Sequence, residues 1–167
     1  MENNNEHLEK EKLILNEEDF YKERVPKEES VQLVVFRLSA EFYCVDINNA
    51  EAVMRIEDIA YLPEAPNHIA GITNLRGNIL SVTNLKVIFG LEEQELTPQS
   101  RLVVIRKGQI ETGVIVDEVL GVADVNNSQI EPALVTLPAE KAQYIEGQCS
   151  VDGKMIGILN VNKILEK

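Results

Sequence analysis

Residues 69–89 read IAGITNLRGNILSVTNLKVIF, and residues 145–165 read IEGQCSVDGKMIGILNVNKIL. An offset of 76 positions aligns the two stretches without a gap and leaves five identical pairs: Ile69/Ile145, Gly71/Gly147, Gly77/Gly153, Asn84/Asn160 and Ile88/Ile164. Six further pairs exchange one apolar residue for another. Each copy has the pattern of a strand, a glycine turn, a second strand, an asparagine and a short helix. The gapless match predicts an internal duplication.

The duplication extends to the residues before each copy. Two further pairs of segments match: Val34–Arg37 with Val103–Arg106, and Val45–Asp46 with Val116–Asp117. We therefore expect one domain over 31–167 with two similar halves, about 31–95 and 100–167, joined through polar residues 92–100. The alternative is that two glycine-turn hairpins resemble each other by chance.

Short apolar runs rich in β-branched residues begin at Val31, which is typical of strands. The predicted strands are Val31–Leu38, Glu41–Ile47, Asn78–Val82, Leu102–Arg106, Thr112–Val116, Ile145–Val151 and Lys154–Leu159. Helical signals are few, and we expect helices only at Asn49–Arg55, Asn84–Phe89 and Val161–Glu166. Many short strands at regular spacing predict an all-β sandwich or barrel rather than alternating βαβ units.

The charge of the chain limits its partners. It has 167 residues, with 28 acidic and 16 basic side chains, for a net charge of −12. The negative electrostatic field of such a chain opposes binding to nucleic acid or to anionic lipid. No apolar run approaches the roughly 20 residues that span a bilayer, and the N-terminus is acidic, so we expect a cytoplasmic protein without direct membrane insertion.

Residues 1–30 differ in composition from the rest of the chain. They hold ten acidic and five basic side chains and only a thin apolar stripe around Leu13 and Ile14. We expect a flexible or partly helical extension that is solvated. A docking segment is the alternative.

The residues of 31–167 hold no recognisable catalytic or metal-binding motif. Cys44 and Cys149 lie 105 positions apart in apolar runs, which favours two core residues, and His68 reads as a surface turn histidine. No nucleophile elbow, ligand spacing or phosphate-binding loop occurs, so we expect no cofactor and no enzymatic activity. Two carboxylates alone could still cleave glycosides, but Asp117-Glu118 is expected to be a solvated turn.

Arg76 is the one charged residue of the repeat that suggests a function. It is the only positive charge between Glu64 and Lys86, and it precedes the turn glycine Gly77. An arginine at a hairpin tip, next to the apolar Leu75, suits contact with carboxylates or carbonyls of a partner. The alternative is an arginine that only solvates the turn.

The hairpin motif resembles the signature of the CheW family of chemotaxis coupling proteins. The resemblance rests on Ile69-x-Gly71-Ile72-x-Asn74-Leu75-Arg76-Gly77-x-Ile79-x-x-Val82-x-x-Leu85, preceded by Pro63-x-x-Pro66. The segments Val114-Ile115-Val116-Asp117-x-Val119 and Ile130-Glu131-Pro132 resemble the family's second half. Together the similarity covers about 31–165.

The resemblance implies two SH3-like five-stranded β-barrel subdomains and a non-enzymatic scaffold. Its partners would be the regulatory domain of a CheA-type histidine kinase and the cytoplasmic tip of a chemoreceptor, which would recruit it to the membrane. A protein that is monomeric alone would assemble with them into arrays. The alternative is a CheW-like adaptor in another sensory or motility pathway, with altered receptor pairing.

The resemblance also implies where partners bind. It points to Asn74, Leu75, Arg76 and Gly71 in the hairpin, and to Glu51, Ala52, Val53 and Met54 in the short segment beside the receptor groove. Ala52 stands where the family commonly has a glutamate. Asn84 and Asn160 stand where it usually has aspartates, and an asparagine can still cap the helical turn that follows.

Overall fold

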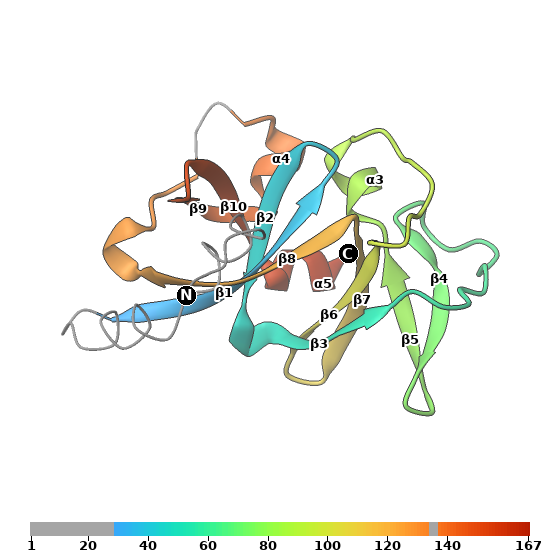
Figure 1. The fold of residues 1–167 in the computed structure, drawn as a ribbon. Helices are drawn as coiled ribbons and strands as arrows, with labels where there is room; N and C mark the ends of the chain where they lie inside the picture. The colour runs from blue at the N-terminus through green and yellow to red at the C-terminus, as the bar shows by residue number, and fades with distance from the viewer. Residues whose placement is uncertain (1–28, 134–136) are drawn as a thin grey trace.

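The computed structural model describes residues 29–133 and 137–167, which form two five-stranded sheets (Figure 1). Barrel A has the strand order β8-β1-β2-β10-β9. Its strands are β1 (Ser30–Leu38), β2 (Glu41–Asp46), β8 (Glu118–Asn126), β9 (Ile145–Val151) and β10 (Lys154–Leu159). Barrel B has the order β3-β6-β7-β5-β4. Its strands are β3 (Ala50–Arg55), β4 (Ile69–Leu75), β5 (Asn78–Thr83), β6 (Arg101–Lys107) and β7 (Ile110–Val116).

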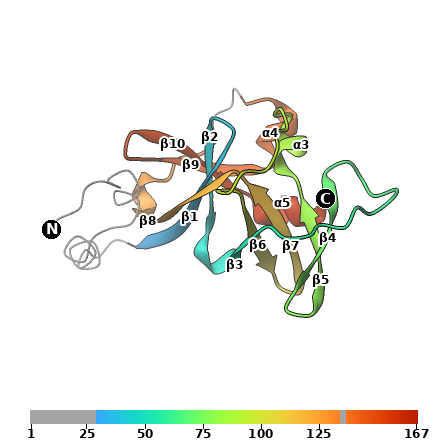
Figure 2. The ribbon, with the colours of Figure 1, turned by 45° about the vertical axis from the view of Figure 1, so that its right-hand side comes forward.

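Short helices connect the strands, and the expected all-β architecture with two five-stranded subdomains is confirmed. The helices are η1 (Ile47–Asn49), α3 (Leu85–Phe89), η2 (Asn127–Gln129), α4 (Ala139–Ala142) and α5 (Val161–Glu166). Two views show α5 between the barrels (Figures 1 and 2).

Each sheet is closed by one backbone bridge. In barrel B, Ala60 and Ile72 exchange N–H···O bonds of 2.8 and 2.9 Å. In barrel A, Glu131 and Gln148 do the same, also at 2.8 and 2.9 Å. Ile72 and Gln148 are partners in the 76-residue repeat, so the duplication preserves the contact that satisfies the sheet edge.

The two sequence halves do not each form one barrel. Barrel A combines the hairpin β1–β2 with the late strands β8–β10, whereas barrel B is built from the continuous run β3–β7. The exchange depends on two parallel pairings, which place Ile158 beside Cys44 and Val82 beside Gly113. Each half therefore gives its first hairpin to the barrel that the other half completes.

Apolar side chains form three clusters because strands alternate their side chains between two faces. One cluster fills barrel A, a second fills barrel B, and a third lies between the barrels. Cys44 and Cys149 are 0% and 2% exposed inside barrel A, so the prediction that they are core residues is confirmed. In the third cluster, the ring of Phe89 in α3 lies 5.2 Å from Tyr43 and 6.1 Å from Tyr144.

The predicted helix over Asn49–Arg55 is wrong, because these residues form η1 and then β3. The exposure of β3 alternates residue by residue, and Ala50, Ala52 and Met54 turn inward. Its pairing with β6 sets Ala52 opposite Val104. The tertiary pairing therefore overrides the local helical preference of this segment.

The expected solvated turn at Asp117-Glu118 is also wrong. Asp117 accepts hydrogen bonds from the backbone N–H of Ser39 and from the Nζ of Lys86, at 2.6 and 3.0 Å. Glu118 begins β8, a strand that the sequence did not predict. Asp117 thus connects the β1–β2 turn of barrel A to the helix α3, which follows β5 of barrel B.

Two further expectations concern His68 and the N-terminal residues. His68 is half-buried rather than on the open surface, and its Nε2 has no hydrogen-bond partner within the described ranges. The expected N-terminal extension lies outside the described residues, apart from Glu29 and Ser30.

Candidate functional site

The hairpin β4–β5 ends in a two-residue turn that projects from barrel B. Leu75 pairs with Asn78, and Arg76 and Gly77 between them have φ values of 53° and 86°. Positive φ at both central positions is the requirement of a type I′ turn, whose twist matches the flanking strands. The side chain of Asn74 accepts a hydrogen bond of 2.9 Å from the N–H of Gly77, which fixes the turn from within.

The side chain of Arg76 is exposed at this tip. Within the described ranges no hydrogen bond or ion pair joins it to another residue, whereas Leu75 packs against the barrel B core. A left-handed backbone is unfavourable for an arginine, so the hairpin itself holds the residue in place. The result is a guanidinium presented to solvent from a fixed backbone.

Gly71 contributes to the same hairpin from inside the structure. It is buried, and a Cβ atom placed on it would lie 2.3 Å from the carbonyl oxygen of Ala60. The missing side chain lets residues 56–60 lie across β4 and form the bridge to Ile72. Gly71 therefore supports the hairpin and the barrel closure, and is not part of the surface around Arg76.

The segment Glu51–Met54 presents its side chains on two faces of β3. Val53 is 45% exposed, whereas Met54 packs inside barrel B. Glu51 is also on the outer face, where its carboxylate lies 3.6 Å from the Nε of Arg106. Ala52 is half-buried on the inward side.

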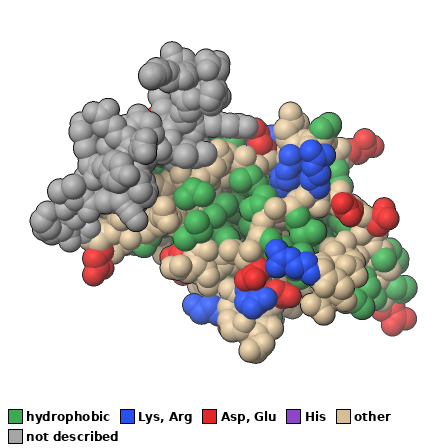
Figure 3. Space-filling model, turned by 60° about the horizontal axis from the view of Figure 1, so that its bottom comes forward, with side chains coloured by type: hydrophobic (Ala, Val, Ile, Leu, Met, Phe, Trp, Pro, Cys, Tyr) green, Lys and Arg blue, Asp and Glu red, His purple; other side chains and the backbone are tan. Residues whose placement is uncertain are grey.

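A groove of about 290 Å³ lies between β3 and β8, at the junction of the two barrels. All its lining residues are apolar or glycine: Val34, Ile47, Ala50, Ala52, Val53, Val119, Gly121 and Val122. On the face seen in Figure 3, apolar side chains gather near the centre, with charged side chains around them. An apolar strip bordered by charge suits the apolar side of a partner helix.

The structure therefore divides the predicted residues into two groups. Arg76, Leu75 and Asn74 belong to the tip of β4–β5, and Ala52 and Val53 line the groove. Neither group contains the titratable cluster that catalysis would need. Among the residues of 29–133 and 137–167, no three His, Cys, Asp or Glu side chains are placed to hold a metal ion.

Comparison with known proteins shows the family of the chain. The family model described as the CheW-like domain matches residues 32–167. The chain belongs to the CheW family. The match begins two residues into β1 and includes both barrels.

Individual CheW relatives match over most of their length. The chain is 30% identical to the chemotaxis protein CheW of Thermotoga maritima over 81% of this chain and 88% of that protein. It is 30% identical to protein FrzA of Myxococcus xanthus over 78% of this chain and 88% of that protein. A crystal structure of the scaffolding protein TtCheW from Thermoanaerobacter tengcongensis superposes with a TM-score of 0.73 at 34% identity. The match covers 81% of this chain and 86% of TtCheW.

Membership of the CheW family assigns the coarse function. The family consists of non-enzymatic scaffolds, and the chain is a chemotaxis adaptor of this kind. None of the described helices is long and apolar enough to cross a membrane.

Sequence reasoning missed most of the groove. Six of its eight lining residues were not predicted as site residues: Val34, Ile47, Ala50, Val119, Gly121 and Val122. Val119 was part of the CheW-like motif, which could have indicated it. The others come together only because the two halves exchange hairpins, and no local pattern in the sequence signals that exchange.

Proposed function

We propose that this chain couples the cytoplasmic tips of chemoreceptors to the regulatory domain of a CheA-type histidine kinase. The observation that carries the proposal is Arg76, which is exposed and has no partner among the described residues, on a hairpin whose backbone is fixed. Because the hairpin already fixes the backbone at Arg76, only side-chain freedom is lost on binding, and a guanidinium can form two parallel hydrogen bonds to a carboxylate. Such a contact would give specificity to a scaffold that has no catalytic groups.

The apolar groove supplies the second contact of this proposal. A chemoreceptor tip is helical, and a helix can insert one apolar stripe into the strip that contains Val53 and Val122. The Glu51–Arg106 pair beside β3 would lie at the rim of such a contact. We place the protein in the cytoplasm as a monomer, recruited to the membrane by receptors and assembled into arrays with its partners.

The experiment is co-sedimentation of the full chain with receptor cytoplasmic fragments and the kinase. The proposal predicts a ternary complex, weaker binding for Arg76→Glu, and an unchanged melting temperature. A purified, folded protein that sediments with neither partner would contradict it.

A second candidate function is that of a CheW-like adaptor for another sensory or motility pathway. The observation that favours it is Ala52, which leaves the groove without a carboxylate. The variant Ala52→Glu discriminates between the two candidate functions. If the native chain serves another pathway, the variant should bind chemoreceptor fragments more tightly than the native chain does. If the native chain already binds them as tightly as the variant does, the second candidate fails.

A further inference from the structure

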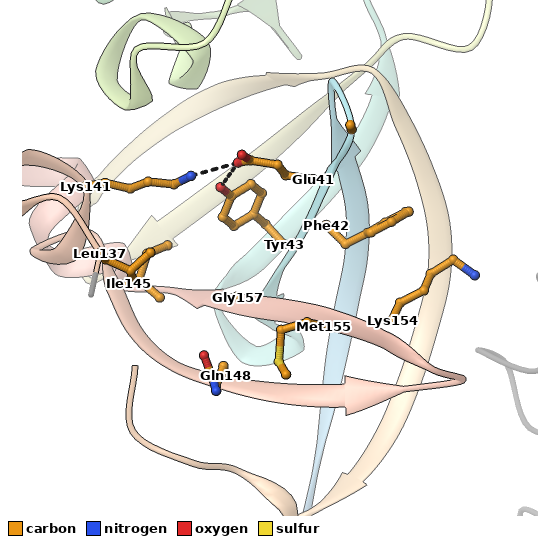
Figure 4. Close-up of a pocket in the computed structure, with 11 residues that line it drawn as sticks. Glu41, Phe42, Tyr43, Leu137, Lys141, Ile145, Gln148, Lys154, Met155 and Gly157 are labelled. Atoms are coloured by element: carbon orange, nitrogen blue, oxygen red, sulfur yellow. Dashed lines mark hydrogen bonds and ion pairs between the residues drawn. The ribbon is translucent and has the colours of Figure 1, made fainter. Parts of the chain in front are cut away.

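A second groove lies on barrel A and shares no lining residue with the groove between β3 and β8. It has a volume of about 390 Å³ and lies between strands β2, β9 and β10 and the helix α4. Its lining residues are Ala40, Glu41, Phe42, Tyr43, Leu137, Lys141, Ile145, Gln148, Lys154, Met155 and Gly157. Figure 4 shows Tyr43, Glu41 and Lys141 on one side of the opening, with Met155 and Gln148 on another.

The repeat relates this groove to a face of barrel B that the chain itself covers. Ile145 and Gly157 correspond to Ile69 and Ser81, which line a cavity of only about 140 Å³. There the C-terminal helix α5 covers the sheet with Ile164 and Leu165. One end of the chain thus covers the barrel B face, while the corresponding barrel A face keeps an open groove.

The charge of the barrel A groove is opposite to that of the chain. Two lysines and one glutamate line it, for a net +1, whereas the chain as a whole carries −12. The Nζ of Lys141 lies 2.8 Å from Glu41 and 5.7 Å from the ring centre of Tyr43. The Nζ of Lys154 lies 5.7 Å from the ring centre of Phe42. The groove therefore combines aromatic surface with ammonium groups and suits an acidic, apolar peptide.

The residues that precede β1 include a peptide of this chemistry. Residues 13–21 read LILNEEDFY, with apolar groups on both sides of three consecutive acids. Tyr43 in β2 pairs with Phe36 in β1. Phe36 lies six residues after Ser30, so the groove begins about 20 Å along β1 from Ser30. Tyr21 lies nine residues before Ser30 and can reach about 30 Å from it. The connection is therefore long enough for an intramolecular contact.

We propose that residues 13–21 of the same chain dock in the barrel A groove. The apolar residues at the two ends of the segment bind the surface around Tyr43 and Met155, and the acids lie beside Lys141 and Lys154. Because the segment is tethered, its effective concentration at the groove is in the mM range, so weak contacts suffice. A ligand of the groove would have to displace it.

The test uses the full chain with a nitroxide attached at Asn16→Cys. The native cysteines are 0% and 2% exposed, so the label is confined to the new site. The proposal predicts loss of the amide NMR signals of Phe42, Gln148 and Gly157. It predicts retention at the corresponding residues of barrel B. These are Ile72 and Ser81 in the repeat, and Glu111, which pairs with Arg106 as Phe42 pairs with Arg37. No loss, or equal loss on both barrels, would overturn the proposal.

Matched variants separate docking from misfolding. Lys154→Glu/Met155→Glu changes the groove at the β9–β10 hairpin, and Asn78→Glu/Ile79→Glu changes the corresponding hairpin of barrel B. Met155 and Ile79 are 54% and 74% exposed, so neither pair should disturb a core. Only the first pair should restore the lost signals. A mixture of unlabelled molecules that carry the nitroxide and isotope-labelled molecules that do not tests whether the segment docks on a second copy. Loss of signal in the isotope-labelled molecules would show an intermolecular contact and overturn the proposal.

Discussion

The tips of the hairpins β4–β5 and β9–β10 have the same backbone and opposite charges. Arg76 and Asp152 have φ values of 53° and 59°, and the glycines that follow them have φ values of 86° and 82°. The flanking pairs are also equivalent, Leu75 with Asn78 and Val151 with Lys154. The duplication therefore preserved the geometry, and the difference between the barrels lies in the side chains that this geometry presents.

The two barrels also close in the same way, but they leave different amounts of space for a side chain at the closing glycine. At the barrel closures, a Cβ on Gly71 would lie 2.3 Å from the oxygen of Ala60, and a Cβ on Gly147 would lie 3.1 Å from the oxygen of Glu131. Barrel B is thus packed more tightly at its closure than barrel A. The barrel that carries Arg76 is the one that tolerates less change there.

The largest expected effect comes from Gly71→Ala. Its methyl group must displace a backbone oxygen, so we expect a loss of about 4 kcal/mol in the free energy of unfolding. The control Gly147→Ala should lose about 1–2 kcal/mol, because its contact requires only a small shift. Urea unfolding of both variants checks this. Equal losses would show that the two closures are equally tight.

Lys86→Met should have the next largest effect. Lys86 is 6% exposed, and its Nζ lies 2.8 Å from Asp117, so its removal takes the nearest cation from a half-buried carboxylate. We expect a loss of about 3 kcal/mol. The control is Lys163→Met on the corresponding helix α5, where the pair with Glu166 is exposed and is expected to contribute less than about 1 kcal/mol. Equal losses of stability in the two variants, measured by thermal unfolding, would show that the Lys86–Asp117 pair stabilises the fold no more than the exposed pair does.

The same ion pair predicts a pH dependence. Burial raises the pKa of Asp117, but hydrogen bonds from Lys86 and the N–H of Ser39, together with the charges of Lys86 and Arg37, outweigh it and lower the pKa below its ordinary value. The stabilisation is therefore complete above the unfolded-state pKa, about 4, and is lost as the pH falls through the folded pKa. The stability difference between the native chain and Asp117→Asn should shrink from pH 5 downward. A constant difference over that range would refute the linkage.

Smaller and equal effects are expected at the two helix caps. The side chain of Asn84 accepts a hydrogen bond of 3.0 Å from the N–H of Lys86, and that of Asn160 accepts one of 3.2 Å from Lys163. Substitution of either by alanine should cost about 1 kcal/mol. Chemical denaturation measures both, and a difference much larger than the error would show that the caps have diverged.

The sequence predicted the parts of the fold that local patterns encode. The repeat, the glycine turns and both asparagine caps were visible because each depends on neighbouring residues. The strand β3 was mistaken for a helix because its pairing with β6 joins residues about 50 positions apart. The strand β8 was missed because Gly121 and Asp124 interrupt its alternation, and its partner β1 lies at the other end of the domain.

The candidate site divides in the same way. Arg76 could be found because the motif around it is contiguous and its turn is encoded by Gly77. The groove could not be found as a whole, because Val34, Val53 and Val122 come together only through the exchange of hairpins between the barrels. Met54 followed Val53 in the motif but faces the core, since neighbouring residues of a strand point to opposite sides.

The most direct test of the account exchanges the charges of the two hairpin tips. Arg76→Glu and Asp152→Lys are each compared with the native chain by co-sedimentation with receptor fragments and the CheA-type kinase, and by thermal unfolding. The account predicts that Arg76→Glu loses ternary binding while Asp152→Lys retains it, with both melting temperatures unchanged. Retained binding in Arg76→Glu, or equal loss in both variants, would contradict the claim that the barrel B tip carries the coupling.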